Sequence, residues 1–278
     1  MIRADLHLHT TASDGTDAPG SIGPLALREN LQCAAITDHD TVSGVPEFIE
    51  GCAETGIDAL CGVEASTGPT GRIHVLCYFD PRDISVFDAY FTRILDSRAG
   101  RAREIIRKLE RMGMTLDADK IFAASSSSVG RPLIAREMVD KGYVGSVAEA
   151  FEKYLGDSGP AYVPLPALST STAVRELREM GGVPVLAHPV QMKLSRSALF
   201  QTVTGHRNSG LLGLEVYHPD QSGDYSLYRE LAEDLGLIPT GGSDHHGSNK
   251  RDVYLGCTSG AWPDAQKSID KIKGFLNR

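Results

Sequence analysis

The sequence predicts an α/β fold, a mostly parallel sheet or barrel covered by helices, with a helical insertion in the middle of the chain. In the first and last thirds, short apolar segments typical of buried strands alternate with helical segments. Between residues 83 and 156 this alternation stops and the pattern becomes almost wholly helical. A chain of 278 residues is long enough for one large domain, or for one domain that carries a substantial insertion.

Seven segments have the composition of strands, which is fewer than a complete (β/α) barrel has. The predicted strands are residues 2–9, 32–37, 58–64, 72–79, 182–188, 211–218 and 236–246. The helices predicted between or beside them are residues 24–30, 44–55, 171–180, 194–204 and 224–235. Within the insertion, the apolar spacing predicts helices at residues 97–112, 131–141 and 146–155.

Composition excludes several classes of protein. The net charge of −8 disfavours a protein that coats duplex DNA. No apolar run approaches the roughly 20 residues of a membrane span, and the polar N-terminus is unlike a signal peptide. The five cysteines form no C-x-x-C pair and lie mostly in apolar or helical surroundings, so we expect reduced thiols in a cytoplasmic protein. Nothing in the sequence indicates an obligate protein partner.

Histidines and carboxylates recur in or just after the predicted strands. The carboxyl ends of strands in βα proteins meet on one rim, so these side chains are expected to converge. Imidazoles and carboxylates without thiolates suit Zn, Mn or Fe, and the set is too large for one ion, so two or three ions are expected. A single histidine could be an ordinary core or surface residue, but packing would prefer apolar residues at so many strand ends. The candidates are His7, His9, Asp14, His39, Glu64, His74, His188, Asp244 and His246, with His245 as an alternative to His246.

Five motifs from this set resemble the PHP (polymerase and histidinol phosphatase) family. They are D-L-H-L-H-T-x-x-S-D-G (5–15), I-T-D-H-D-T (36–41), G-V-E (62–64), A-H-P (187–189) and G-S-D-H-H (242–246). The resemblance extends from residue 1 to about residue 250 and implies a distorted (β/α)7 barrel with a metal site that hydrolyses phosphoesters. We expect residues 1–82 and 165–278 to form this barrel, and residues 83–164 to form a helical insertion that contributes to the substrate pocket.

The family resemblance also implies a division of the ligands among three ions. The implied sets are His7, His9, Glu64 and Asp244 for one ion, Glu64, His74 and His188 for a second, and Asp14, His39 and His246 for a third. In this assignment His245 is a neighbour of the ligands and not itself a ligand. Among divalent metals we expect Mn first, with Zn, Fe and Mg as alternatives.

Further motifs resemble the PHP subgroup that contains nucleoside 3',5'-bisphosphate phosphatases and 5'-3' exoribonucleases. They are V-G-R-P-L-I-A (129–135), G-Y-V (142–144), E-A-F-E-K-Y-L-G (149–156), A-Y-V-P (161–164) and E-V-Y-H-P (215–219). One departure is Leu133, where the subgroup often has His.

This resemblance implies a metal-dependent phosphatase that removes the 3'-phosphate of a nucleoside 3',5'-bisphosphate and leaves the 5'-monophosphate. The alternatives are a 5'-3' exoribonuclease acting on short 5'-phosphorylated RNA, a histidinol phosphatase, and a non-catalytic metal-binding protein. The acidic net charge and the lack of a long basic stripe favour a small nucleotide as the substrate.

Arginines of the insertion are candidates for binding phosphate. Arg98 and Arg101 are three residues apart and share a helix face, while Arg131 lies at the start of the next helix, whose amides favour an anion. Guanidinium groups suit phosphate oxygens, although for most of the arginines here a solvated ion pair is the alternative. His218 is a further candidate for contact with phosphate or ribose, and Asp14 or His218 could protonate the leaving oxygen.

Overall fold

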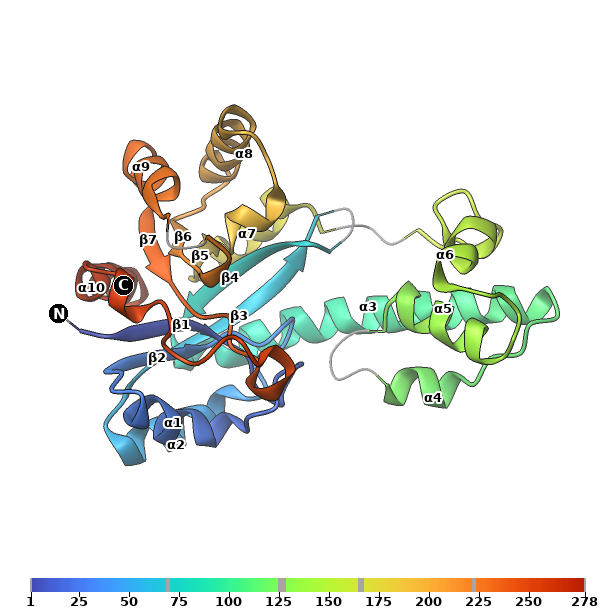
Figure 1. Cartoon of the computed structure of the whole chain (residues 1–278), viewed down its shortest axis with the longest axis horizontal. Helices are drawn as coiled ribbons and strands as arrows, with labels where there is room; N and C mark the ends of the chain where they lie inside the picture. The colour runs from blue at the N-terminus through green and yellow to red at the C-terminus, as the bar shows by residue number, and fades with distance from the viewer. Residues whose placement is uncertain (1, 69–70, 125–128, 165–167, 222–223, 278) are drawn as a thin grey trace. The chain divides into compact units, whose positions relative to one another are not determined.

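The computed structural model describes residues 2–68, 71–124, 129–164, 168–221 and 224–277. The chain forms two compact units, one made of Met1–Ala89 and Ala167–Arg278 and the other of Tyr90–Pro166. Figure 1 shows the helices and strands of both units.

The first unit is built on a seven-stranded sheet that forms a nearly closed, distorted barrel, as the sequence predicts (Figure 1). The strands follow one another around the sheet in chain order: β1 (Ala4–Leu8), β2 (Cys33–Ile36), β3 (Asp58–Thr67), β4 (Ile73–Phe79), β5 (Val183–Leu186), β6 (Gly213–Tyr217) and β7 (Ile238–Gly241). Strand β4 runs antiparallel to both of its neighbours, and the other neighbouring pairs are parallel.

The segment that follows β7 returns to β1 and brings the two edges of the sheet together. The amide of Asp244 donates to the carbonyl of His7, and the amide of His9 donates to the carbonyl of His245, both at 2.9 Å. Gly242 passes so near His7 that a Cβ at this position would collide with its backbone and Cβ, so a glycine is required for this approach.

Strand β3 is longer than the sequence indicates. It continues to Thr67 because its last residues pair with the start of β4, where Thr67 lies opposite Ile73 and Ser66 opposite His74. Glu64 is therefore inside β3 and not at its end. The antiparallel course of β4 places its first residues, including His74, at the rim where the neighbouring parallel strands end.

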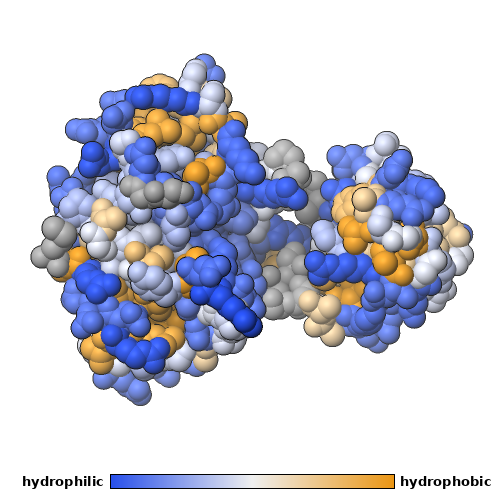
Figure 2. All heavy atoms as spheres, in the orientation of Figure 1, coloured by the Kyte–Doolittle hydropathy of each residue, from blue (hydrophilic) through white to orange (hydrophobic). Residues whose placement is uncertain are grey.

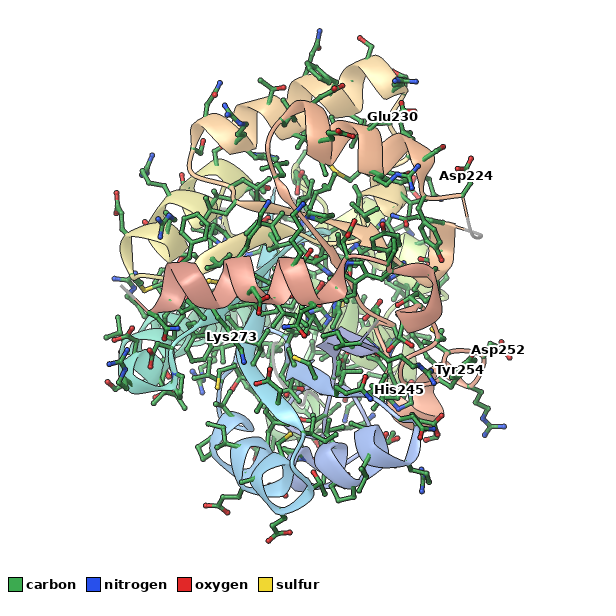
Figure 3. All side chains as sticks on the ribbon, turned by 90° about the vertical axis from the view of Figure 1, so that its left-hand side faces the viewer. Asp224, Glu230, His245, Asp252, Tyr254 and Lys273 are labelled. Atoms are coloured by element: carbon green, nitrogen blue, oxygen red, sulfur yellow. The ribbon has the colours of Figure 1, made fainter. Side chains whose placement is uncertain are left out.

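Helices pack on the outside of the first unit's sheet (Figure 1). They are α1 (Ile22–Arg28), α2 (Val45–Thr55), α7 (Thr170–Glu179), α8 (Arg196–Asn208), α9 (Ser226–Asp234) and α10 (Ala265–Leu276). The last of these was not among the predicted helices. It buries Ile269 and Ile272, and its Lys273, labelled in Figure 3, lies 2.6 Å from the carboxylate of Asp58 at the start of β3.

The second unit is helical and has its own core. Helix α3 (Ile84–Arg111) begins in the first unit, and most of its length belongs to the second. The other elements are α4 (Ala118–Ala123), α5 (Arg131–Asp140), α6 (Val147–Ala150) and a π-helical turn (Phe151–Leu155). Buried side chains from these elements pack together, among them Ile105, Leu109, Ile134, Met138 and Leu155.

Helix α3 begins at Ile84, well before the helix predicted from residue 97. Its early turns carry Phe87 and Phe91, whose side chains are buried. Within the described ranges, none of the helices has both the length and the apolar character required to cross a bilayer.

The surface of the first unit has an apolar groove between α8 and α9, where hydrophobic side chains gather in Figure 2. Phe200, Leu227 and Leu231 line it together with polar residues. Nothing in this groove resembles the strand-end set of histidines, which lies elsewhere in the unit.

Candidate metal centre

The nine candidate ligands converge at one rim of the barrel, and we call them the Glu64 cluster. His7 lies in β1 and His9 directly after it, and the loops that follow β2, β5 and β7 supply further histidines and Asp244. Most members are buried, whereas the side chain of Asp14 is 46% exposed. The members are His7, His9, Asp14, His39, Glu64, His74, His188, Asp244 and His246.

Glu64 lies at the centre, and each of its carboxylate oxygens faces several imidazoles. Its Oε1 lies 3.0 Å from Nδ1 of His74 and 3.0 Å from Nε2 of His188. Its Oε2 lies 3.1 Å from His39, 3.2 Å from His9 and 3.4 Å from His7. One carboxylate therefore touches imidazoles that come from several different parts of the sheet, which is the arrangement that a bridging ligand needs.

Two further carboxylates complete the cluster. Oδ1 of Asp244 lies 3.2 Å from Nε2 of His9 and 3.5 Å from Nε2 of His7. Oδ1 of Asp14 lies 3.3 Å from Nε2 of His246, and its Oδ2 lies 3.9 Å from Nε2 of His39. Asp244 thus faces His7 and His9, and Asp14 faces the histidines of the loops after β2 and β7.

Four overlapping groups in the cluster could each hold an ion, since their ligand atoms lie within 4.8 Å of one another. Every candidate from the sequence belongs to at least one of them. The groups are His9, Asp14, His39 and His246; His7, His9 and Asp244; His7, Glu64 and His188; and His39, Glu64 and His74.

The donor atoms of the cluster fit divalent ions. Nδ1 of His39 and Oε2 of Glu64 lie 3.1 Å apart without forming a hydrogen bond, and they and Nδ1 of His9 are buried with no hydrogen-bond partner among the described residues. The Nε2 atoms of His7 and His9 face each other at 3.2 Å. Buried polar atoms are normally satisfied, so these unsatisfied atoms indicate a site for cations. Nitrogen and oxygen donors without thiolates suit Mn, Zn or Fe.

The electrostatics of the cluster keep its carboxylates charged. Burial alone would raise the pKa of Glu64, but the surrounding imidazoles, His74 foremost, hold it well below its usual range. Burial alone would lower the pKa of His9, yet the carboxylates of Asp244 and Glu64 raise it to about 9. The ionised carboxylates attract a cation, and binding of a metal ion by His9 would displace the proton that this raised pKa retains on its ring.

The structure distinguishes the two adjacent histidines that the sequence could not separate. His246 directs Nε2 into the cluster, while its Nδ1 lies 2.8 Å from the carbonyl of Asp244. His245, labelled in Figure 3, is turned toward the neighbouring loops: its Nε2 lies 2.9 Å from Oδ2 of Asp17, and its Nδ1 lies 2.9 Å from the carbonyl of Val253. Both ring nitrogens of His245 face acceptors, so neither is available to an ion.

Glu215 of β6 is a buried residue of the site that the sequence analysis did not single out. One of its oxygens lies 2.9 Å from Nδ1 of His7, and the other accepts the backbone amide of His188 at 2.6 Å. A carboxylate can only accept here, so Nδ1 of His7 carries the proton and its Nε2 lone pair is directed into the cluster. The motif E-V-Y-H-P contains this glutamate, but the pattern of the strand gives no sign that its side chain contacts His7 and His188.

Replacing Glu215 with Gln is expected to weaken the binding of divalent ions by about 10–100-fold, the usual cost of losing such a supporting carboxylate. An amide has one acceptor oxygen, so either His7 or the amide of His188 loses its partner. Isothermal titration of the metal-free protein with Mn²⁺ measures the effect, and melting in chelator establishes that the variant is folded. Glu233→Gln, at an exposed position of α9, is the matched control. Unchanged affinity in Glu215→Gln would contradict this role.

His218, predicted as a substrate or acid residue, lies at the edge of the cluster. Its Nδ1 accepts the backbone amide of Asp220 at 3.2 Å, so in the neutral ring the proton is on Nε2. That Nε2 is buried without a hydrogen-bond partner among the described atoms and lies 3.5 Å from Oδ2 of Asp244. His218 is therefore arranged as a donor and not as an ion ligand.

The arginines predicted to bind phosphate lie in the second unit, where two of them lie close to the same aromatic ring. The Cζ atoms of Arg101 and Arg131 lie 5.9 Å and 5.6 Å from the centre of the Tyr162 ring. Arg101 donates to the carbonyl of Val163 at 2.7 Å, and Arg131 donates to Asp157 at 2.9 Å. Burial, and then the like charge of Arg131, lower the pKa of Arg101, as expected for two cations held near each other. Arg98 lies on α3, three residues before Arg101.

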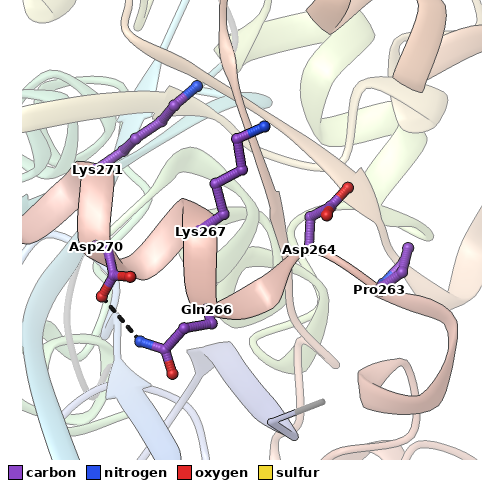
Figure 4. Close-up of a pocket in the computed structure, with 6 residues that line it drawn as sticks. All are labelled: Pro263, Asp264, Gln266, Lys267, Asp270 and Lys271. Atoms are coloured by element: carbon purple, nitrogen blue, oxygen red, sulfur yellow. Dashed lines mark hydrogen bonds between the residues drawn. The ribbon is translucent and has the colours of Figure 1, made fainter.

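A second surface groove runs along α10 and is lined by residues of mixed charge, among them Lys267 and Asp270 (Figure 4). Gln266 and Asp270 form a hydrogen bond of 2.8 Å within it. This groove contains no histidine and no set of converging carboxylates, so the Glu64 cluster is the better candidate for chemistry.

A family model, the sequences of known proteins and a solved structure all show similarity to this chain. Residues 5–120 match the family model of the PHP domain. A 5'-3' exoribonuclease from Haemophilus influenzae is 31% identical over 249 residues, which cover 87% of this chain and 89% of that protein. A 3',5'-nucleoside bisphosphate phosphatase from Chromobacterium violaceum is 31% identical over 265 residues, which cover 91% of each chain.

A solved structure from Bifidobacterium adolescentis, described as a metal-dependent phosphoesterase, has the same fold with a TM-score of 0.69. It is 28% identical, and the superposition covers 98% of this chain and 96% of that one. The similarity therefore includes the helical insertion as well as the barrel.

Proposed function

Because this chain belongs to the PHP family of metal-dependent phosphoesterases, we propose that it removes the 3'-phosphate of nucleoside 3',5'-bisphosphates and leaves the 5'-monophosphate. The Glu64 cluster carries the hydrolytic part of this proposal, because it gathers more ligand atoms than a structural ion needs. The similarity to the Chromobacterium violaceum phosphatase along nearly the whole chain supports the choice of substrate.

We propose that the cluster holds two or three divalent ions, with Mn first and Zn, Fe or Mg as alternatives. His7, His9, Glu64 and Asp244 would hold one ion, Glu64, His74 and His188 a second, and Asp14, His39 and His246 a third, so that Glu64 would be shared by two of them. Such ions, when bound, lower the pKa of water and neutralise charge on phosphoryl oxygens. Glu215 orients the His7 ring through its contact with Nδ1, and the ionised Glu64 attracts the cations.

His218 and Asp14 are the two candidates for protonating the leaving oxygen, and His218 is also proposed to contact the substrate. His218 is placed to donate from Nε2 to a substrate oxygen, because its Nδ1 is occupied by the amide of Asp220. Burial raises the pKa of Asp14, but the hydrogen bond from His246 and the charges of nearby imidazoles outweigh it and leave the pKa well below the usual range. Asp14 is therefore ionised, which favours a role as ligand or base over that of an acid.

We propose that the arginines of the insertion, residues 83–164, bind the second phosphate of the substrate. Arg101 and Arg131 bring two guanidinium groups to one ring, and like charges held together are relieved by an anion. Arg98 is the third member of this proposed set. A short RNA with a 5'-phosphate would use the same groups, and the similarity to the Haemophilus influenzae exoribonuclease makes this the second candidate function.

Arg131→Met is expected to lower kcat/KM for adenosine 3',5'-bisphosphate by about 10–100-fold, the cost of losing a charge-assisted hydrogen bond of about 1.5–3 kcal/mol. Adenosine 3'-monophosphate lacks the 5'-phosphate, so its kcat/KM should change little. The ratio of the two specificity constants separates loss of phosphate contact from general damage to the unit. Arg136→Met, at an exposed position of the same helix, is the control. An equal loss for both substrates would argue against the 5'-phosphate contact.

A substrate panel tests the proposed function. The Mn-loaded protein is incubated with adenosine 3',5'-bisphosphate, histidinol phosphate and a short 5'-phosphorylated RNA, and released phosphate and mononucleotides are quantified. We expect phosphate release to be fastest from the bisphosphate. Mononucleotide release from RNA as the dominant reaction would favour the exoribonuclease. A preference for histidinol phosphate would instead indicate a histidinol phosphatase, and no release from any of the three substrates with metal bound would indicate a non-catalytic metal-binding protein.

A further inference from the structure

Lys250 brings a positive charge to the rim of the Glu64 cluster. It ends the short helical turn Gly247–Lys250, which begins one residue after His246. Its Nζ lies 2.5 Å from Oδ2 of Asp244. The side chain of Lys250 is 39% exposed, whereas that of Asp244 is 7% exposed. The ammonium group therefore lies between a buried carboxylate and solvent, where an incoming anion can reach it.

The turn that carries Lys250 is fastened to the loop that carries Asp14. The amide of Ser248 donates to Oγ1 of Thr16 at 2.8 Å, and Nδ2 of Asn249 donates to the carbonyl of Asp14 at 2.8 Å. Gly247 has φ of 62°, and a Cβ there would collide with Thr16, so the turn depends on glycine. These contacts fix the base of the Lys250 side chain relative to the cluster.

The two oxygens of Asp244 have different surroundings. Oδ1 faces the imidazoles of His7, His9 and His246, which are proposed ligands. Oδ2 faces two donors from separate segments, Nε2 of His218 at 3.5 Å and Nζ of Lys250. A cation held at the Oδ1 side would neutralise much of the carboxylate's charge and weaken its hold on the ammonium group.

We propose that Lys250 binds the phosphate group that is cleaved, through the non-bridging oxygens of that group. This inference rests on the proposed phosphoesterase site and adds to it a binding residue from the barrel, separate from the arginines of the insertion. Lysine is suited to this task because its flexible stem carries a compact charge that can follow a phosphate. His218, which meets the same oxygen of Asp244, faces the phosphate beside it.

The test measures phosphate binding without turnover. Inorganic phosphate is titrated into Mn-loaded wild type, Lys250→Met and Lys250→Arg, with Mn content determined for each protein. We expect Lys250→Met to weaken phosphate binding by about 10-fold or more at unchanged Mn content, the lower end of the cost of losing a hydrogen bond to a charged group. Lys250→Arg should restore most of the affinity. Lys267→Met, an exposed lysine of α10 (Figure 4), should bind phosphate as wild type does.

Two results would overturn the inference. Unchanged phosphate affinity in Lys250→Met, with full Mn content, would show that the lysine does not contact phosphate. Loss of Mn from Lys250→Met would show that the lysine acts only by positioning Asp244. Failure of the proposed function is distinguishable, because a Mn-loaded wild type that binds phosphate through Lys250 but hydrolyses no bisphosphate would refute that function and leave this inference standing.

Discussion

Replacing Glu64 with Gln is expected to lower turnover by at least about a thousandfold. Glu64 is buried and touches five imidazoles, so its carboxylate is the single group common to most of the cluster. The neutral amide keeps the shape but loses the charge and one acceptor oxygen. Charge stabilisation of several kcal/mol depends on correctly held ions, and about 1.4 kcal/mol corresponds to a tenfold change in rate.

Steady-state phosphate release and bound Mn are measured together for the Glu64 variant. We expect less metal to bind and the residual activity to stay low when Mn is added in excess. Glu54→Gln, at an exposed position of α2, is the matched control and should behave as wild type. Near-normal turnover by Glu64→Gln at matched metal content would contradict a bridging role for this residue.

Removal of metal is expected to destabilise the first unit, in which the whole cluster lies. An ion that binds only the folded state stabilises it by about 2.7 kcal/mol at a hundred times its dissociation constant. For a protein of this size class, that corresponds to a shift in Tm of roughly 5–10 °C between chelator and saturating Mn²⁺. Calorimetry with and without Mn²⁺ measures the shift.

The adjacent histidines supply a matched pair for this experiment. His246→Asn removes a ring that faces Asp14, so its Tm should respond less to Mn²⁺ than that of wild type. His245→Asn removes contacts to Asp17 and Val253 and should lower Tm in both conditions, while the response to Mn²⁺ is retained. Equal responses of the two variants would contradict the assignment of His246 to the cluster.

The sequence predicts the barrel well because strands and ligands leave local signals. Short apolar runs, most of them with His, Asp or Glu at or just after their ends, marked seven strands, and all seven are present. The strand limits were less accurate, because β3 is extended by its pairing with β4 and that pairing is not local. Helix α10 was not predicted, although its buried residues Ala265, Ile269 and Ile272 recur at helical spacing and could have revealed it.

Sequence patterns did not identify the residues whose roles depend on contacts with segments far away in the sequence. Glu215 looks like a polar residue in a strand until the structure brings His7 and the amide of His188 to its two oxygens. Lys250 looks like an ordinary surface lysine until its turn is seen to be tied to Thr16 and the Asp14 loop. The opposite orientations of His245 and His246 likewise depend on loops far away in the sequence.

Removal of the 3'-phosphate is decided by the products that the Mn-loaded protein forms from adenosine 3',5'-bisphosphate. We expect one equivalent of phosphate and adenosine 5'-monophosphate, resolved by chromatography from the 3'-monophosphate, and we expect no reaction after chelation of the metal. Metal-dependent removal of the 3'-phosphate would be contradicted by any of three results: formation of the 3'-monophosphate, undiminished turnover in chelator, or no phosphate release by a fully metal-loaded protein.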